Sequence, residues 1–179
     1  MNVFYFSSDL FASVMSVSML SLLENNRSFG EIKFYIVDDG ISEENKKNLL
    51  EMVSQYNSAD NVRGIVFIDA PDPVKAFRFP FKSRYQMGHS YPRMLIGSIL
   101  PDSVDRVLCL DSDTLVCGDL QDLWNRDLGC NINRIVFINI QNTLLLGQTH
   151  RSKRHTFAMR FMESNQLGNI HIRYRVTIG

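Results

Sequence analysis

Short apolar runs alternate with segments of helical periodicity along the N-terminal part of the chain. The runs at 3–6, 33–37 and 64–68 each end on residues that favour turns, which is typical of strands inside a sheet. The segments between them, 11–25 and 43–56, carry apolar residues every three or four positions, as amphipathic helices do. This strand-helix-strand-helix-strand order predicts an α/β fold with a mostly parallel, Rossmann-like sheet and right-handed crossovers.

The spacing of apolar residues also predicts which face of each helix is buried. In the helix at 11–25, the three-to-four spacing of a stripe that faces the core is followed by Val14, Val17, Leu20 and either Ser21 or Leu23. Ser42 stands just before the second helix, where its hydroxyl can cap the first turn. The predicted apolar face of that second helix consists of Leu49, Leu50 and Val53.

The pattern becomes less regular after the third strand. Residues 70–90 contain three prolines and form a connection that is long for a compact domain, as binding loops often are. An apolar stretch bounded by prolines predicts a helix over 92–100, and 106–110 reads as a further buried strand. A short helix is expected over 119–124.

The strand at 106–110 ends abruptly on Asp111, Ser112 and Asp113. In open α/β sheets, ligands bind at the carboxyl ends of the strands. If the chain stays extended there, Asp111 and Asp113 lie on the same side, and their like charges repel unless a cation compensates. A hard divalent ion that bridges these carboxylates to a phosphate is one interpretation. The alternative is that Asp111 caps the strand, Asp113 caps a turn, and both are solvated.

Other motifs leave alternatives open. Asp38, followed by Asp39 and Gly40, ends the strand at 33–37 and either faces the same crevice or only forms a turn. The sequence has neither the glycine-rich dinucleotide fingerprint nor a phosphate-loop motif. An apolar strand followed by two aspartates also occurs in haloacid-dehalogenase-type phosphatases, although Thr114 stands one position too early for that motif.

Charge divides the chain into two unequal parts. Nineteen basic and nineteen acidic side chains cancel, which favours neither nucleic acid nor an anionic membrane as a partner. Residues 1–129 contain 12 Lys and Arg against 18 Asp and Glu, whereas 130–179 contain 7 against one, so the two parts carry −6 and +6. The basic last segment leaves peripheral membrane contact open.

The cysteines and the N-terminus bear on the compartment. Three cysteines without close spacing do not suggest a disulfide framework, and a reducing compartment follows. The first residues lack the basic and apolar regions of a signal peptide, and no apolar run reaches the length of a transmembrane segment. We expect a cytoplasmic protein.

Three stretches, 16–26, 33–47 and 90–129, together resemble glycosyltransferase family 8, the retaining group that includes bacterial lipopolysaccharide galactosyl- and glucosyltransferases and glycogenin. The resemblance joins an aspartate pair after a strand, an aromatic-Pro-Arg helix upstream, and the run DLQDLWNRDLG downstream, in the family's order. It covers about residues 1–129.

This resemblance implies a fold of the kind called GT-A, a donor such as UDP-glucose or UDP-galactose, a saccharide or glycolipid acceptor, and Mn²⁺ or Mg²⁺. By the same resemblance, Asp111 and Asp113 would hold the metal, with Asp111 also reaching the ribose or the donor sugar. Arg93 would contact the donor. By the resemblance, Ser7 and Asp9 fall where the family lines the uridine pocket after its first strand. We count Asp38 and Ser112 among the further candidates for donor binding.

We expect the resemblance to end at Gly129. Cys130 stands where the family has Asp, and we find none of the later family motifs in 131–179. We therefore expect residues 1–129 to be the nucleotide-sugar-binding part, and 130–179 to be a truncated, frame-shifted or divergent segment that is poorly ordered. A chain without the family's C-terminal half would transfer sugar slowly or not at all. A remnant that binds the UDP-sugar and metal without turnover is the non-enzymatic alternative.

Overall fold

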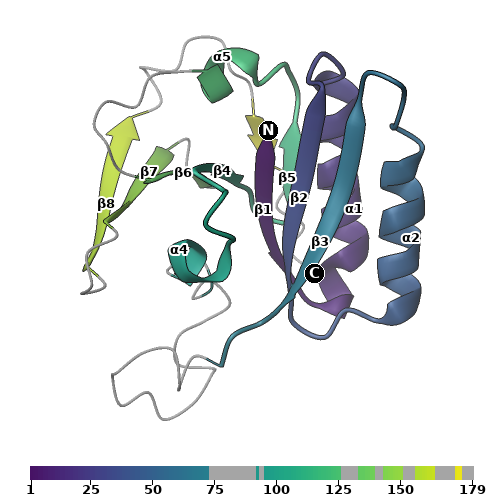
Figure 1. Cartoon of the computed structure of the whole chain (residues 1–179), viewed down its shortest axis with the longest axis horizontal. Coiled ribbons are helices and arrows are strands. Elements are labelled where there is room, and N and C mark those ends of the chain that lie inside the picture. The colour runs from purple at the N-terminus through teal and green to yellow at the C-terminus, as the bar shows by residue number, and fades with distance from the viewer. Residues whose placement is uncertain are drawn as a thin grey trace.

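A seven-stranded sheet forms the centre of the protein (Figure 1). A computed structural model describes residues 1–72, 92 and 95–125 with their side chains, and further strands within 133–174. The strands are β1 Asn2–Ser7, β2 Glu31–Asp38, β3 Val62–Asp69, β4 Arg106–Cys109, β5 Thr114–Val116, β6 Asn133–Asn139, β7 Thr143–His150, β8 Thr156–Glu163 and β9 Ile172–Tyr174. The helices are α1 Asp9–Asn25, α2 Glu43–Ser54, α4 Ile96–Ile99 and α5 Gln121–Asn125.

The order of the strands reverses at β1. The sheet runs β3-β2-β1-β4-β6-β7-β8, and β1 pairs in parallel with β2 on one side and with β4 on the other. The chain moves outward from β1 to β3 and then returns to the opposite side of β1 as β4. This confirms the predicted parallel sheet. In open α/β sheets, a reversal of this kind opens a crevice at the carboxyl ends of the two strands.

Alternate side chains of the central strands pack into two apolar layers. On β1, Val3 and Tyr5 pack with α1 and α2, whereas Phe4 packs against α4 on the opposite face. On β4, Leu108 and Val107 divide in the same way. Figure 1 shows α1 and α2 side by side on one face of β1–β3. Because both faces are covered, these strands are apolar almost throughout, rather than alternating with polar residues.

The predicted buried face of α1 is wrong at three positions, although Leu23, one of the two alternatives for the fourth, is buried. Val14, Val17 and Leu20 are 41%, 55% and 37% exposed, and the face that packs on the sheet consists of Ala12, Met15, Ser18, Met19, Leu22 and Leu23. Between Asp9 and Glu24 the helix has no charged residue, so apolar side chains occur on every side of it. With so little contrast, the sequence offers two stripes of equal spacing, and packing selects the one that contains the methionines.

The second helix follows its prediction more closely. Leu49 and Val53 are buried, and the Ser42 hydroxyl accepts the backbone N–H of Asn45 at 3.3 Å, which confirms the predicted cap. Leu50, which was also assigned to the apolar face, is 47% exposed and is a further correction. Leu49 and Val53, together with the partly buried Met52, make up the apolar face of α2 that packs into the core.

The structure describes only parts of the segments expected before β4. Of the helix expected over 92–100, the structure describes α4 at Ile96–Ile99, and the expected helix over 119–124 forms as α5. The long proline-containing connection lies mostly outside the described residues. β5 was not predicted; it follows the acidic residues directly and pairs with β9 in an antiparallel arrangement.

The last part of the described chain adds strands to the sheet. β6 pairs in parallel with β4, with Arg134 opposite Arg106, and β7 and β8 continue the sheet in antiparallel fashion. Gly129 lies outside the described residues, so the domain boundary placed there stays a prediction. In the described part of the chain, no helix is long and apolar enough to cross a membrane.

Candidate functional site

The carboxyl ends of the parallel strands meet at one edge of the sheet. Ser7 at the end of β1 pairs with Asp38 at the end of β2, which in turn pairs with Asp69 at the end of β3. On the other side of β1, Cys109 at the end of β4 pairs with Phe4. Polar residues that follow β1, β2, β3 and β4 therefore gather along this edge. Asp69 belongs to this row but was not singled out from the sequence.

Asp111, Ser112 and Asp113, which we call the acidic turn, are attached directly to β1. The Ser112 hydroxyl donates to the carbonyl of Phe6 at 2.9 Å, and the backbone N–H of Leu110 donates to the carbonyl of Phe4 at 3.0 Å. These bonds continue the β1–β4 pairing past the last residue of β4. The acidic turn consequently lies at the reversal point of the sheet.

The backbone of the acidic turn is not extended. The N–H of Thr114 donates to the carbonyl of Asp111 at 3.1 Å, and the Thr114 hydroxyl donates to the same carbonyl at 2.8 Å. The expectation that Asp111 and Asp113 alternate to one side of an extended chain is therefore wrong, since a turn closes between them. Both aspartates and Ser112 are partly exposed, so the turn is open to ligands.

Asp38 is engaged within its own loop. Its Oδ1 accepts the N–H groups of Gly40 and Ile41 at 2.9 and 2.6 Å, and its Oδ2 pairs with Lys46 Nζ at 2.8 Å. Burial opposes ionisation, but the Lys46 ammonium and the two N–H groups outweigh it and lower the pKa of Asp38. Gly40 has a φ of 88°, a left-handed conformation that glycine adopts readily. These contacts favour the turn interpretation of Asp38.

Ser7 is the last residue of β1 and Asp9 begins α1, close to the strand end that the sequence predicted, and both contact the protein itself. Ser7 is buried, and its hydroxyl donates to the carbonyl of Ser8 at 3.1 Å. Asp9 Oδ1 accepts the N–H of Ser42 at 2.8 Å and the side-chain amide of Asn45 at 2.7 Å. The hydrogen bond from the backbone N–H of Ser42 contributes most to lowering the pKa of Asp9. Asp9 thus joins the start of α1 to the start of α2.

Arg93, the predicted donor contact, lies outside the described residues, so its position relative to this edge of the sheet stays a prediction. The remaining predicted residues fall into two groups. Asp111, Ser112 and Asp113 form the acidic turn. Ser7 and Asp38 are the last residues of β1 and β2, and Asp9 begins α1.

The acidic turn offers hard oxygen donors for a divalent metal. Asp111 and Asp113 supply two partly exposed carboxylates, which is the donor chemistry that Mg²⁺ and Mn²⁺ take. Within residues 1–72, 92 and 95–125, no three His, Cys, Asp or Glu side chains are grouped closely enough to hold a metal. The donor set fits an ion that completes its coordination with phosphate oxygens and water, as Mg²⁺ commonly does.

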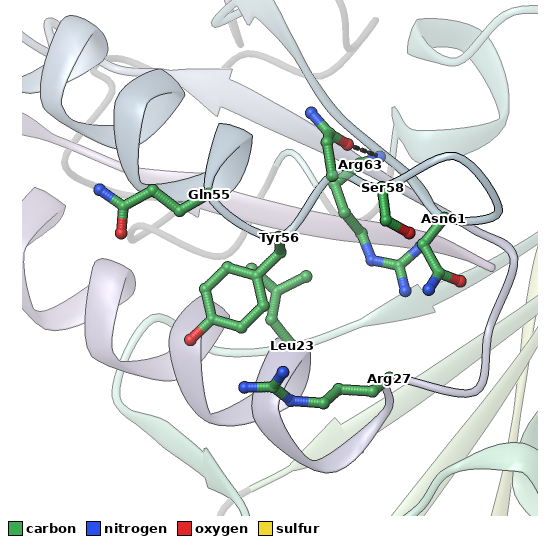
Figure 2. Close-up of a pocket in the computed structure, with 8 residues that line it drawn as sticks. Leu23, Arg27, Gln55, Tyr56, Ser58, Asn61 and Arg63 are labelled. Carbon is green, nitrogen blue, oxygen red and sulfur yellow. Dashed lines mark hydrogen bonds between the residues drawn. The ribbon is translucent and has the colours of Figure 1, made fainter.

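A cavity of about 430 Å³ opens at the opposite, amino-terminal edge of the sheet (Figure 2). There Arg63 donates to the carbonyls of Phe29 and Gly30 at 2.6 and 3.2 Å, while Arg27 pairs with Glu24. The bonds of Arg63 join β3 to the loop before β2, whereas the pair of Arg27 with Glu24 is exposed to solvent. The cavity lies away from the acidic turn and forms no part of that site. Its lining consists of Leu23, Arg27, Gln55, Tyr56, Asn57, Ser58, Asn61 and Arg63.

Comparison with known proteins identifies the family of the chain. The sequence profile of Glycosyl transferase family 8 matches residues 2–166. The chain belongs to this family. The match confirms the resemblance seen in the sequence and extends it, because it continues past Gly129 into the segment that the sequence analysis set apart. Family 8 membership is therefore not confined to residues 1–129.

Solved structures of family members share the fold. A crystal structure of the galactosyltransferase LgtC with donor and acceptor sugar analogues is 31% identical, with a TM-score of 0.56, over 72% of this chain and 44% of LgtC. An active-site mutant of LgtC gives 30% identity and a TM-score of 0.59, over 79% of this chain and 48% of LgtC. The sheet and its flanking helices therefore have the predicted GT-A fold of the family 8 enzymes.

The curated relatives are longer proteins. General stress protein A of Bacillus subtilis is 27% identical over 129 residues, which are 72% of this chain and 43% of that protein. A Haemophilus influenzae protein named as a glycosyltransferase is 28% identical over 148 residues, which are 79% of this chain and 41% of that protein. The chain spans less than half the length of these two relatives.

Proposed function

We propose that this family 8 chain binds a UDP-sugar together with Mn²⁺ or Mg²⁺ and contains the donor site of a retaining hexosyltransferase. The observation that carries the proposal is the position of the acidic turn. Ser112 fastens it to Phe6 of β1, at the reversal point where open α/β sheets bind nucleotides. A nucleotide diphosphate is repelled by carboxylates alone, and a divalent ion between them reverses that effect.

Each residue of the proposed site has a separate task. Asp111 and Asp113 hold the ion, and Ser112 keeps the turn against β1. The bound ion would act as a Lewis acid that draws charge from the departing diphosphate. Ser7 and Asp9 border the nucleotide pocket after β1, with Asp9 acting also through its tether to α2. Arg93 is proposed as a donor contact on the family pattern alone.

The substrates are proposed at the level of class. The donor is UDP-glucose or UDP-galactose, and the likeness to a galactosyltransferase that binds donor and acceptor analogues supports the second of these. The acceptor is a saccharide or glycolipid such as lipopolysaccharide. We place the chain in the cytoplasm, at the inner face of the membrane where a glycolipid acceptor is presented. Residues 130–179, of which 130–166 still match the family profile, are proposed as a divergent segment that lacks the family's later metal and diphosphate groups.

Titration calorimetry with UDP tests the donor site directly. We expect UDP to bind clearly more tightly with Mn²⁺ present than in chelator, because the ion screens the aspartates from the diphosphate. Equal binding under both conditions would count against the metal role of the acidic turn. Magnesium-dependent hydrolysis of an aryl phosphate, without metal-dependent UDP binding, would favour the phosphatase alternative.

A further inference from the structure

A chain of buried hydroxyl groups runs from the core of the protein to the acidic turn. The phenol oxygen of Tyr5 lies 2.8 Å from the hydroxyl of Ser18, which lies 2.9 Å from the hydroxyl of Thr114. The Thr114 hydroxyl lies 2.8 Å from the carbonyl oxygen of Asp111. All three hydroxyl-bearing residues are buried, so water does not compete for these bonds.

Counting protons fixes the direction of every bond in this chain. The carbonyl of Asp111 can only accept, so the single hydroxyl proton of Thr114 is donated to it. Thr114 must then accept from Ser18, whose own proton is thereby used, and Ser18 must accept from Tyr5. The order is Tyr5 to Ser18 to Thr114 to Asp111. Bonds aligned in this way polarise and strengthen one another.

Two further polar side chains of α1 hold the strand that follows Thr114. Ser21 accepts the N–H of Val116 at 2.9 Å, one turn beyond Ser18 on the same helix. Further along, the side-chain amide of Asn25 donates to the carbonyl of Val116 at 3.0 Å. Ser18 is therefore the member of this row that reaches the acidic turn, and Ser21 holds the strand after it.

We propose that Ser18 and Thr114 are positioning residues for the metal site. They fix the carbonyl of Asp111, and with it the backbone that carries both aspartates, while Ser112 holds the same turn from the β1 side. The inference rests on the proposed function and adds two residues to it. Partners that orient metal ligands through hydrogen bonds typically contribute tenfold to a hundredfold to metal affinity.

A purely structural role for these hydroxyls makes a different prediction. Buried polar groups that lose a partner destabilise a fold wherever they are. If Thr114 only stabilised the fold, substituting it would lower the unfolding temperature without changing how well the remaining folded protein binds metal. The positioning role requires weaker metal binding by the folded protein, and this difference can be measured without any activity assay.

The experiment compares variants of the full 179-residue chain by titration calorimetry with Mn²⁺ in the presence of UDP. Thr114→Val keeps the branched shape but removes the hydroxyl, and we expect it to weaken Mn²⁺ binding about tenfold. Thr114→Ser restores the hydroxyl and should return the affinity close to that of the wild type. Ser18→Ala, which keeps a helix-favouring residue, should shift affinity in the same direction as Thr114→Val.

The matched control is Ser21→Ala, which removes a hydrogen bond between α1 and β5 but leaves the acidic turn untouched. It should lower the unfolding temperature and keep the wild-type affinity for Mn²⁺. Wild-type affinity in Thr114→Val and Ser18→Ala, or equal weakening in Ser21→Ala, would overturn the inference while leaving the proposed function intact. A wild-type chain that fails to bind Mn²⁺ with UDP would overturn the proposed function and the inference together.

Discussion

The hydroxyl of Ser112 donates to the carbonyl of Phe6 across 2.9 Å, and this bond joins residues that are 106 positions apart in the sequence. It fastens the middle of the acidic turn to the penultimate residue of β1. The bond thereby connects the segment after β4 to β1 near the carboxyl ends of these two strands, where the order of the sheet reverses. Any ligand held by Asp111 and Asp113 is presented at the crevice that the fold itself creates.

The first prediction concerns the charge of the acidic turn. Asp113→Asn removes one carboxylate but preserves its size, so we expect binding of UDP with Mn²⁺ to weaken at least about tenfold. Calorimetry with and without chelator measures the effect. Asp122→Asn, an exposed aspartate of α5, is the charge-matched control and should bind like the wild type. Equal affinities in the two variants would contradict the metal role of Asp113.

The second prediction concerns Asp38 and pH. Because the folded protein lowers the pKa of Asp38, its carboxylate stabilises the fold fully above the ordinary carboxyl pKa of about 3.9. That contribution is lost as the pH falls further, through the folded pKa. We expect Asp38→Asn, which breaks the pair with Lys46, to cost about 1 to 2 kcal/mol of unfolding free energy at pH 7.

Chemical denaturation from pH 7 to pH 3 measures this dependence. The difference between wild type and Asp38→Asn should stay constant down to about pH 4 and shrink below it. Asp60→Asn, which changes an exposed aspartate at the other edge of the sheet, should stay within about 0.5 kcal/mol of wild type throughout. A difference between wild type and Asp38→Asn that grows as the pH falls would have the wrong sign for a lowered pKa.

The third prediction tests which face of α1 is buried. Met15 is fully buried, so Met15→Ala should lower the unfolding free energy by about 2 to 4 kcal/mol. Val14 is its neighbour on the exposed face, and Val14→Ala should cost less than about 1 kcal/mol. Denaturant titration of both variants measures the contrast. The opposite order of the two effects would restore the face predicted from the sequence.

The two stripes of α1 show where sequence reasoning reached its limit on the fold. The strands β1 to β4 were found because each apolar run stops at turn residues, which is a local signal. The rotation of α1 was missed because the signal that sets it is not local. Ser18 bonds to Thr114, 96 positions away, and no spacing within the helix reveals that partner.

For the candidate site too, the sequence could predict some features and not others. Asp111 and Asp113 could be recognised because two carboxylates directly after a buried strand are unusual, whereas the turn that separates them depends on the bonds of Thr114. Asp38 could be placed at the edge, but its pair with Lys46 joins two segments whose meeting depends on how α2 packs. Sequence thus predicts which residues reach the edge better than how their side chains are held.

The last prediction concerns catalysis by the isolated chain. Asp111 and Asp113 supply part of the proposed site, but the chain spans less than half the length of the relatives it matches. The later family groups are proposed to be missing from 131–179. Loss of one group that stabilises transition-state charge commonly costs about 10² to 10³ in rate, and loss of acceptor positioning can cost more. We expect UDP release from UDP-glucose or UDP-galactose to be far below an ordinary turnover of about 10 s⁻¹.

A coupled assay for UDP, run with and without saccharide acceptors and with and without chelator, measures that rate. Residual turnover that chelator abolishes, and that Asp113→Asn also lacks, would come from the proposed site rather than from a contaminant, because both changes remove the same electrostatic contribution to the leaving diphosphate. Metal-dependent UDP binding without turnover would assign the chain to the binding-only alternative. Turnover near 10 s⁻¹ would mean that the segment containing β6 to β9 completes the site. In the chain, these strands come after the acidic turn, after β5 and after α5.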